Sequence, residues 1–72
     1  MRSTQDLVQI VSNGGGVIVN SSTPTRDLVQ IVSNAVGNGG RVIIKGAVGM
    51  VQQDLVQIAS NGRGVVIFDF TE

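Results

Sequence analysis

The 72-residue chain contains no cysteine and no histidine. Disulfide bonds, the usual zinc sites and imidazole catalysis are therefore excluded. Tryptophan and tyrosine are also missing, so nucleic-acid bases have little to stack on. A domain this small buries only about 60% of its unfolded surface and usually needs disulfides, a metal or self-association. With disulfides and zinc ligands absent, packing between copies is the support that remains.

Charge is scarce as well. Five Lys and Arg balance five Asp and Glu, and charged residues make up 14% of the chain, against about 25% in typical domains. A neutral chain lacks the basic face that nucleic-acid phosphates require. No apolar run reaches the ~18–20 residues of a membrane span, and the N-terminus has no signal-peptide core. We predict a soluble protein that binds no nucleic acid, membrane, metal or cofactor. The sequence does not indicate a cellular compartment; we expect a cytoplasmic location if the chain is expressed recombinantly.

One eight-residue segment occurs three times. Asp6–Asn13 recurs unchanged as Asp27–Asn34, and returns as Asp54–Asn61 with Ala59 in place of Val. Each copy is followed by a glycine-rich stretch and then by a β-branched run. This periodicity indicates a repeat architecture. We predict a single domain, 1–72, of three repeats. Their approximate bounds are 3–20, 23–46 and 50–70.

The repeated segment is amphipathic with a helical period. On a helical wheel its apolar residues fall within an arc of about 160° and its polar residues fall opposite. On a strand, both faces would mix polar and apolar residues. The pattern therefore favours a helix. The competing model is an all-β fold of three hairpins, because Val and Ile favour strands and Asn13-Gly14 is a hairpin-type dipeptide.

The flanking residues predict where these helices begin and end. Thr23 is expected to cap the second helix, with Pro24 at its first position. Gly14 and Gly62 are expected to be left-handed C-caps, and Ala35-Val36 to extend the second helix. The aspartates that open the repeats are expected in first turns, where negative charge meets the helix dipole. They are Asp6, Asp27 and Asp54.

The β-branched runs 17–20, 42–45 and 65–70 predict three strands. Right-handed helix crossovers make such strands parallel. The predicted fold is α/β: three tandem helix–strand repeats, with a short parallel three-stranded sheet and the helices on one face. The strands carry apolar side chains on both faces, as in a sheet covered on both sides. A second copy is expected to cover the other face, giving a dimer or higher homo-oligomer. The predicted oligomer interface comprises Ile18, Ile43, Val66, Phe68 and Phe70.

The alternation of helix and parallel strand resembles the leucine-rich-repeat kind of solenoid, in architecture only. The leucine-rich consensus and its Asn ladder are missing. The identical polar residues of the repeats, including the three Ser-Asn pairs, resemble an engineered or consensus-type repeat protein. That resemblance implies a structural scaffold.

Catalytic chemistry finds little support. The glycine-rich stretches follow helices, whereas a phosphate loop needs glycines between a strand and a helix. Loops at the correct end offer a weak anion site at Ser21, Ser22, Thr23 and Arg26. Serine has no histidine to activate it, and Lys45 is the single lysine. We predict a structural, self-associating module with no catalytic residues. The alternatives are a module that binds another chain through its sheet face or edge, and a small anion- or nucleotide-binding fragment.

Overall fold

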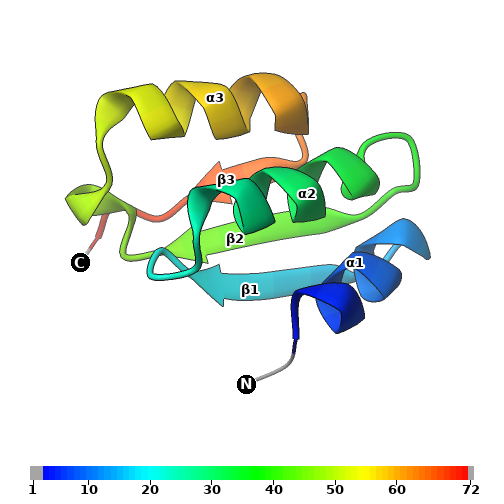
Figure 1. The fold of residues 1–72 in the computed structure, drawn as a ribbon. Coiled ribbons are helices and arrows are strands. Elements are labelled where there is room, and N and C mark those ends of the chain that lie inside the picture. Colours follow the sequence, from blue (N-terminus) through cyan, green and yellow to red (C-terminus); the bar gives the residue numbers. More distant parts are fainter. Residues whose placement is uncertain (1–2, 72) are drawn as a thin grey trace.

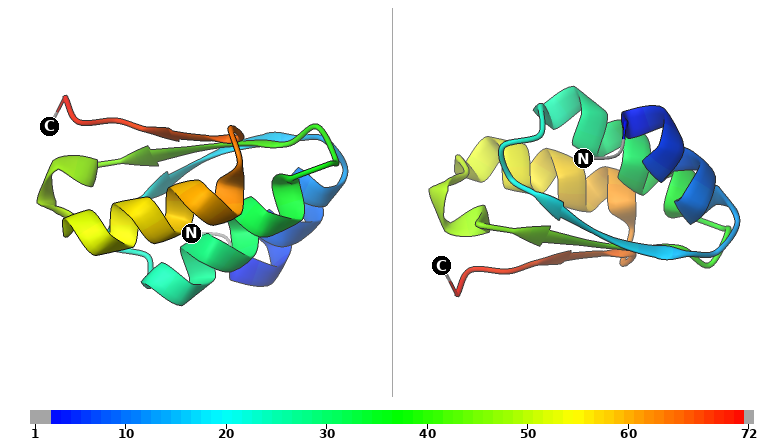
Figure 2. Two further views of the ribbon diagram at one scale, coloured as in Figure 1. Left: turned by 90° about the horizontal axis from the view of Figure 1, so that it is seen from above. Right: turned by 90° about the horizontal axis from the view of Figure 1, so that it is seen from below.

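The computed structural model describes residues 3–71, in which helices and strands alternate along the chain. Their order is α1 (Thr4–Ser12), β1 (Gly16–Asn20), α2 (Thr25–Ala35), β2 (Arg41–Lys45), the 3-10 helix η1 (Ala47–Gly49), α3 (Gln52–Gly62) and β3 (Val66–Phe68). The strands form one parallel sheet in the order β1-β2-β3. The three α-helices cover one face of it (Figures 1 and 2). The predicted α/β fold is confirmed, and the three-hairpin alternative is wrong.

Each α-helix and the strand that follows it form one unit, named here unit 1 (α1 and β1), unit 2 (α2 and β2) and unit 3 (α3 and β3). Every unit uses its repeated Asn in the same way. Asn13 Nδ2 donates to the Gln9 carbonyl at 2.8 Å, and the matching bonds of Asn34 and Asn61 measure 2.7 and 2.8 Å. The three Asn residues therefore share a structural role.

The helix starts differ among the units. The Asp6 amide donates to Ser3 Oγ at 3.2 Å, so α1 has a side-chain cap. The expected cap at Thr23 is wrong: Pro24 is itself the N-cap of α2, with no side-chain cap. Its extended backbone and its carbonyl, which accepts from the Leu28 amide at 3.0 Å, place it one residue before the helix. The three aspartates do lie in first turns, as predicted.

Two of the helix ends depart from expectation. Gly14 has φ +91° after α1, as predicted. Gly62, in contrast, stays inside α3, and Arg63 takes the left-handed position with φ 42°. A methyl group at Gly62 would lie 3.0 Å from Val66 Cγ1, so that a larger residue there would require Val66 to shift. The helix α2 ends at Ala35, and Val36 is its extended C-cap rather than a further helical residue.

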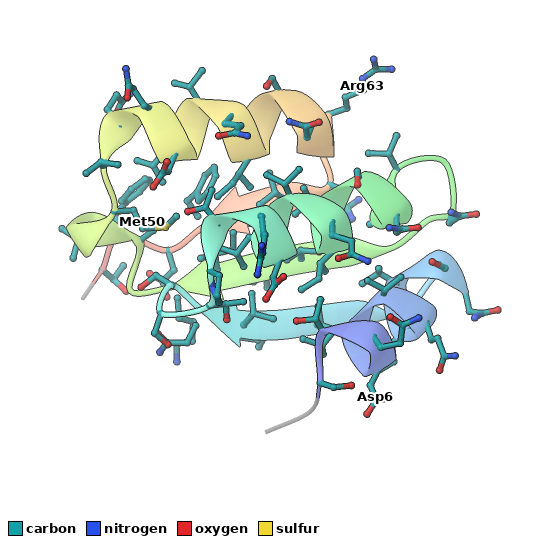
Figure 3. The ribbon with its side chains drawn as sticks, viewed as in Figure 1. Asp6, Met50 and Arg63 are labelled. Carbon is teal, nitrogen blue, oxygen red and sulfur yellow. The ribbon has the colours of Figure 1, made fainter. Side chains whose placement is uncertain are left out.

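The core lies between the helices and the sheet, where side chains fill the space seen between the ribbons (Figure 3). Unit 2 supplies six of the ten buried residues in this cluster, unit 1 three and unit 3 one. Those of unit 2 are Leu28, Ile31, Val32, Ala35, Val42 and Ile44. The middle unit is thus the centre of the molecule in packing as well as in sequence.

The strand register corrects the prediction for β3. Val66 pairs with Val42 and Phe68 pairs with Ile44. Residues that pair across a sheet share a face, and both β2 partners are fully buried under the helices. Val66 and Phe68 accordingly pack against the core. Their predicted place on the uncovered face is wrong, because β3 is offset by one residue from the expected alignment, which exchanges its two faces.

Candidate interaction surface

The face of the sheet opposite the helices carries three aligned isoleucines. Ile18 pairs with Ile43, and Ile43 pairs with Ile67. Ile18 is 65% exposed and Ile67 is 47% exposed, while Ile43 between them is partly exposed. We call these three side chains the isoleucine row. Adjacent strands lie about 4.8 Å apart, so the row forms one continuous apolar strip across the sheet.

Ile67 belongs to this strip, although it was not among the residues predicted for the uncovered face. One signal in the sequence could have found it. Asn20, Lys45 and Asp69 each lie two residues after an isoleucine of the row, and side chains two apart on a strand share a face. Polar residues with that spacing mark the face that meets water. The simple alternation of apolar residues could not, because both faces of β3 are apolar.

Polar groups border the row at both ends of the strands. Arg41 opens β2 and Lys45 closes it, and both are exposed. Asp69 follows β3, where its carboxylate accepts hydrogen bonds from the Thr71 hydroxyl and, at 2.9 Å, from the Thr71 amide. These bonds, with a smaller contribution from the charge of Lys45, hold the Asp69 pKa below its ordinary value of 3.8. Asp69 therefore carries its charge at neutral pH.

The predicted interface residue Phe70 lies beyond the end of β3. Its side chain is 54% exposed. Its ring centroid is 6.1 Å from that of Phe68, with the two planes tilted by 35°. Phe70 is thus half exposed beyond the end of the strand, and its ring lies beside that of Phe68, a residue of the covered face.

The four residues of the predicted anion site have mostly internal partners. Ser21 Oγ donates to the Gly46 carbonyl at 2.9 Å, and the Ser22 amide donates to Asn20 Oδ1 at 2.9 Å. Arg26 is highly exposed and lies 4.0 Å from Asp27. Among the described residues Thr23 Oγ1 is buried without a hydrogen-bond partner. The Ser21 hydroxyl and the Ser22 amide are therefore already bonded within the protein, to the connection after β2 and to the turn after β1.

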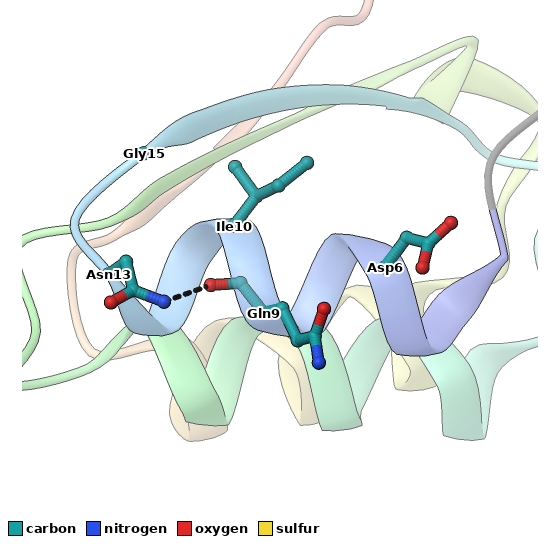
Figure 4. A pocket seen from close by; sticks show the side chains of 5 residues that line it. All are labelled: Asp6, Gln9, Ile10, Asn13 and Gly15. Carbon is teal, nitrogen blue, oxygen red and sulfur yellow. Dashed lines mark hydrogen bonds between the residues drawn. The ribbon is translucent and has the colours of Figure 1, made fainter.

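An open pocket of about 530 Å³ lies on the outer side of unit 1. Three residues of α1 line it together with the C-cap Asn13 and with Gly15, which precedes β1 (Figure 4). Those of α1 are Asp6, Gln9 and Ile10. Ile10 is 40% exposed there. The pocket has one carboxylate, two amides and an isoleucine, and sequence reasoning did not single it out.

Residues 3–71 hold no group of three or more His, Cys, Asp or Glu side chains that could bind a metal ion. None of the helices in this part of the chain is both long and apolar enough to cross a membrane.

The chain matches no protein-family model, no curated protein and no solved structure.

Proposed function

We propose that the chain is a non-catalytic structural module that associates with copies of itself through the isoleucine row. The supporting observation is the row itself: three aligned isoleucines on the face that no helix covers. Burying one isoleucine side chain stabilises an assembly by about 1.5–3 kcal/mol relative to leaving it in water. Two sheets pack face to face at about 10 Å, so the row of a second copy would remove both rows from water.

The border of the row suits such a contact. Arg41, Lys45 and Asp69 stand at the ends of the strands, outside the row. Protein interfaces place apolar side chains at the centre and polar groups at a hydrated rim. Charges of both signs at the rim would also set the orientation of the two copies.

Light scattering coupled to size exclusion tests this proposal. We expect a mass of at least two chains of 7.5 kDa, and a lower mass for Ile18→Lys, because a charge then enters the apolar contact. The matched control is Val48→Lys. Val48 is 63% exposed, close to the 65% of Ile18, but lies in η1 outside the sheet. The control should keep the mass of the parent chain.

A second candidate function is binding of a different chain by strand addition. It is favoured by β1 and β3, which are both edge strands and contain no proline, so their outer backbone groups can accept another strand. A parent chain that stays monomeric at all concentrations would contradict self-association and support this candidate.

A further inference from the structure

Equivalent residues of the three units differ in exposure according to the neighbours of their unit. Ile10 in unit 1 is 40% exposed, whereas Ile31 and Ile58, at the same position in units 2 and 3, are fully buried. Unit 1 is the only one of the three with no unit before it in the described chain. The isoleucine of each segment is therefore buried by the preceding unit.

The opposite flank of each segment shows the reverse pattern. Leu7 and Leu28 are buried, while Leu55 of unit 3 is partly exposed. Val56 is 56% exposed, and its counterparts in units 1 and 2 are partly buried. Ala59 is exposed, although valine at its position in the other units is fully buried. Unit 3 has no unit after it among the described residues. These positions are thus buried by the following unit.

Contacts at the glycines confirm this direction. A methyl group built at Gly62 of unit 3 would lie 3.4 Å from Val32 Cβ of unit 2. One built at Gly40 of unit 2 would lie 3.0 Å from Val11 Cβ of unit 1. The hydrogen bond from Thr25 Oγ1 to Asp54 Oδ2, at 3.2 Å, crosses the boundary between units 2 and 3. Each unit meets the next through one defined pair of surfaces.

Among the described residues, units 1 and 3 each carry one half of this pair that no other unit covers. The outer flank of unit 1 presents Ile10 in the pocket between α1 and the start of β1 (Figure 4). The outer flank of unit 3 presents Leu55, Val56 and Ala59. Repeat proteins normally close their ends with polar capping units, and neither flank is closed in that way.

We propose that these flanks bind each other: unit 3 of one copy stacks on unit 1 of a second copy, as unit 1 stacks on unit 2 within the chain. The new contact continues the interface already present between the units, and its halves have nearly the same sequence as the internal ones. Edge strand β3 of the first copy would then run beside edge strand β1 of the second, with parallel strands as in the rest of the sheet.

Such an interface is heterologous, because two different surfaces meet. Heterologous contacts produce a ring where the rotation closes and an open filament where it does not. The contact uses a different surface from the isoleucine row and does not depend on pairing through that row. Both can be tested separately by working in the Ile18→Lys background, which disables the row.

The test uses two blocked chains in that background. Ile10→Glu blocks the flank of unit 1, and Val56→Glu blocks the flank of unit 3. We expect the unblocked Ile18→Lys parent to form species larger than two chains. Each blocked chain alone should be a monomer, because its free flank finds no free partner flank. An equimolar mixture should give a 1:1 complex of two chains and nothing larger, measured by analytical ultracentrifugation.

Controls address folding and specificity. Both blocked positions are partly or largely exposed, and circular dichroism should show unchanged helix content. Ile10→Val should keep the association of the parent, and Val48→Glu should also keep it. Three results would overturn the proposal: a monomeric Ile18→Lys parent, continued association of either blocked chain alone, or no complex in the mixture. If the unmodified chain associates and its Ile18→Lys variant is a monomer, the result supports the isoleucine row and rejects stacking by the flanks.

Discussion

Unit 2 and the two outer units contain the same Asp-Leu-Val-Gln-Ile sequence in different surroundings. In unit 2 the leucine and isoleucine are both fully buried, because α2 has a helix on either side (Figure 1). In unit 1 the isoleucine is exposed, and in unit 3 the leucine is partly exposed. Identical residues therefore contribute differently to stability, and the difference is set by the number of neighbouring units. Four predictions test this comparison, from the largest expected effect to the smallest.

The isoleucines at equivalent positions give the largest contrast. Ile31→Ala should destabilise the fold by about 2–5 kcal/mol, because it removes buried methyl groups and leaves a cavity. Ile10→Ala removes the same atoms from a partly exposed site and should cost less than about 1 kcal/mol at concentrations where the chain is monomeric. Urea unfolding followed by circular dichroism measures both. Equal losses would contradict the dependence on neighbouring units.

Two equivalent glycines before the strands test the packing between units. A methyl group at Gly40 would lie 2.5 Å from the Val11 carbonyl oxygen, a backbone atom of the adjacent unit. Gly40→Ala should therefore cost about 1–3 kcal/mol by overpacking. At Gly15 the nearest atom, at 2.6 Å, is Cγ2 of the partly exposed Ile10 side chain, and the nearest backbone atom, the Ile10 carbonyl oxygen, is farther away, at 3.0 Å. Gly15→Ala should therefore cost less stability than Gly40→Ala, as measured by thermal unfolding of both variants. A greater loss for Gly15→Ala would contradict this reasoning.

The helix caps offer a smaller, local test of the outer units. Ser3→Ala removes the cap of α1 and should destabilise the chain by about 1 kcal/mol. The N-cap of α3, Val51, has extended backbone angles and no side-chain cap, and its side chain is 62% exposed. Val51→Ser should stabilise by about 0.5–1 kcal/mol because it supplies the missing acceptor. Differential scanning calorimetry measures both shifts. A destabilising Val51→Ser would show that contacts of the valine matter more than the cap.

The smallest expected effect is the pH dependence from Asp69, at the end of unit 3. The Thr71 hydroxyl and amide lower its pKa in the folded chain. Its charged form is therefore favoured by folding, and the stabilisation is present above the pKa of the unfolded chain and lost as pH falls through the lower, folded value. As pH is lowered from neutral, the midpoint of thermal unfolding should fall less steeply for Asp69→Asn than for the unmodified chain. Thr71→Val removes the hydroxyl donor only, and its slope should lie between those of the unmodified chain and Asp69→Asn. A profile unchanged in both variants would contradict this role of the carboxylate.

Much of the fold was predictable from local patterns. The apolar arc of the repeated segment predicted the helices, and the β-branched runs predicted the strands, with Gly16–Asn20 observed for 17–20 and Val66–Phe68 for 65–70. The boundaries were less predictable. Thr23 had the right side chain for a cap, but the non-helical ψ of 142° at Pro24 makes the proline the last residue before α2. Gly62 had the right residue type for a left-handed cap, but it stays within α3, and Arg63 adopts the left-handed conformation instead.

The sequence predicted that one face of the sheet is apolar and uncovered, but it did not correctly predict all the residues on that face. Ile18 and Ile43 were expected on the uncovered face, and they lie there. Phe68 was expected beside them, and it packs under the helices instead. A shift of one residue in a strand exchanges its faces, and a strand with apolar residues on both faces carries no local preference between the two. The deciding contribution is the whole core, which accepts the larger ring of Phe68 and leaves Ile67 outside.

The sequence by itself determined the order of helices and strands and the apolar face of each helix, because these depend on spacing within a few residues. It also indicated the parallel sheet, because a helix connects each strand to the next. It also determined the absence of disulfides and of imidazole chemistry. The tertiary structure alone decided which of three nearly identical segments is fully buried, which face of β3 meets the core, and which apolar residues of units 1 and 3 are exposed. Burial is a property of neighbours in space, and equal sequences acquire different burial when the number of their neighbours differs.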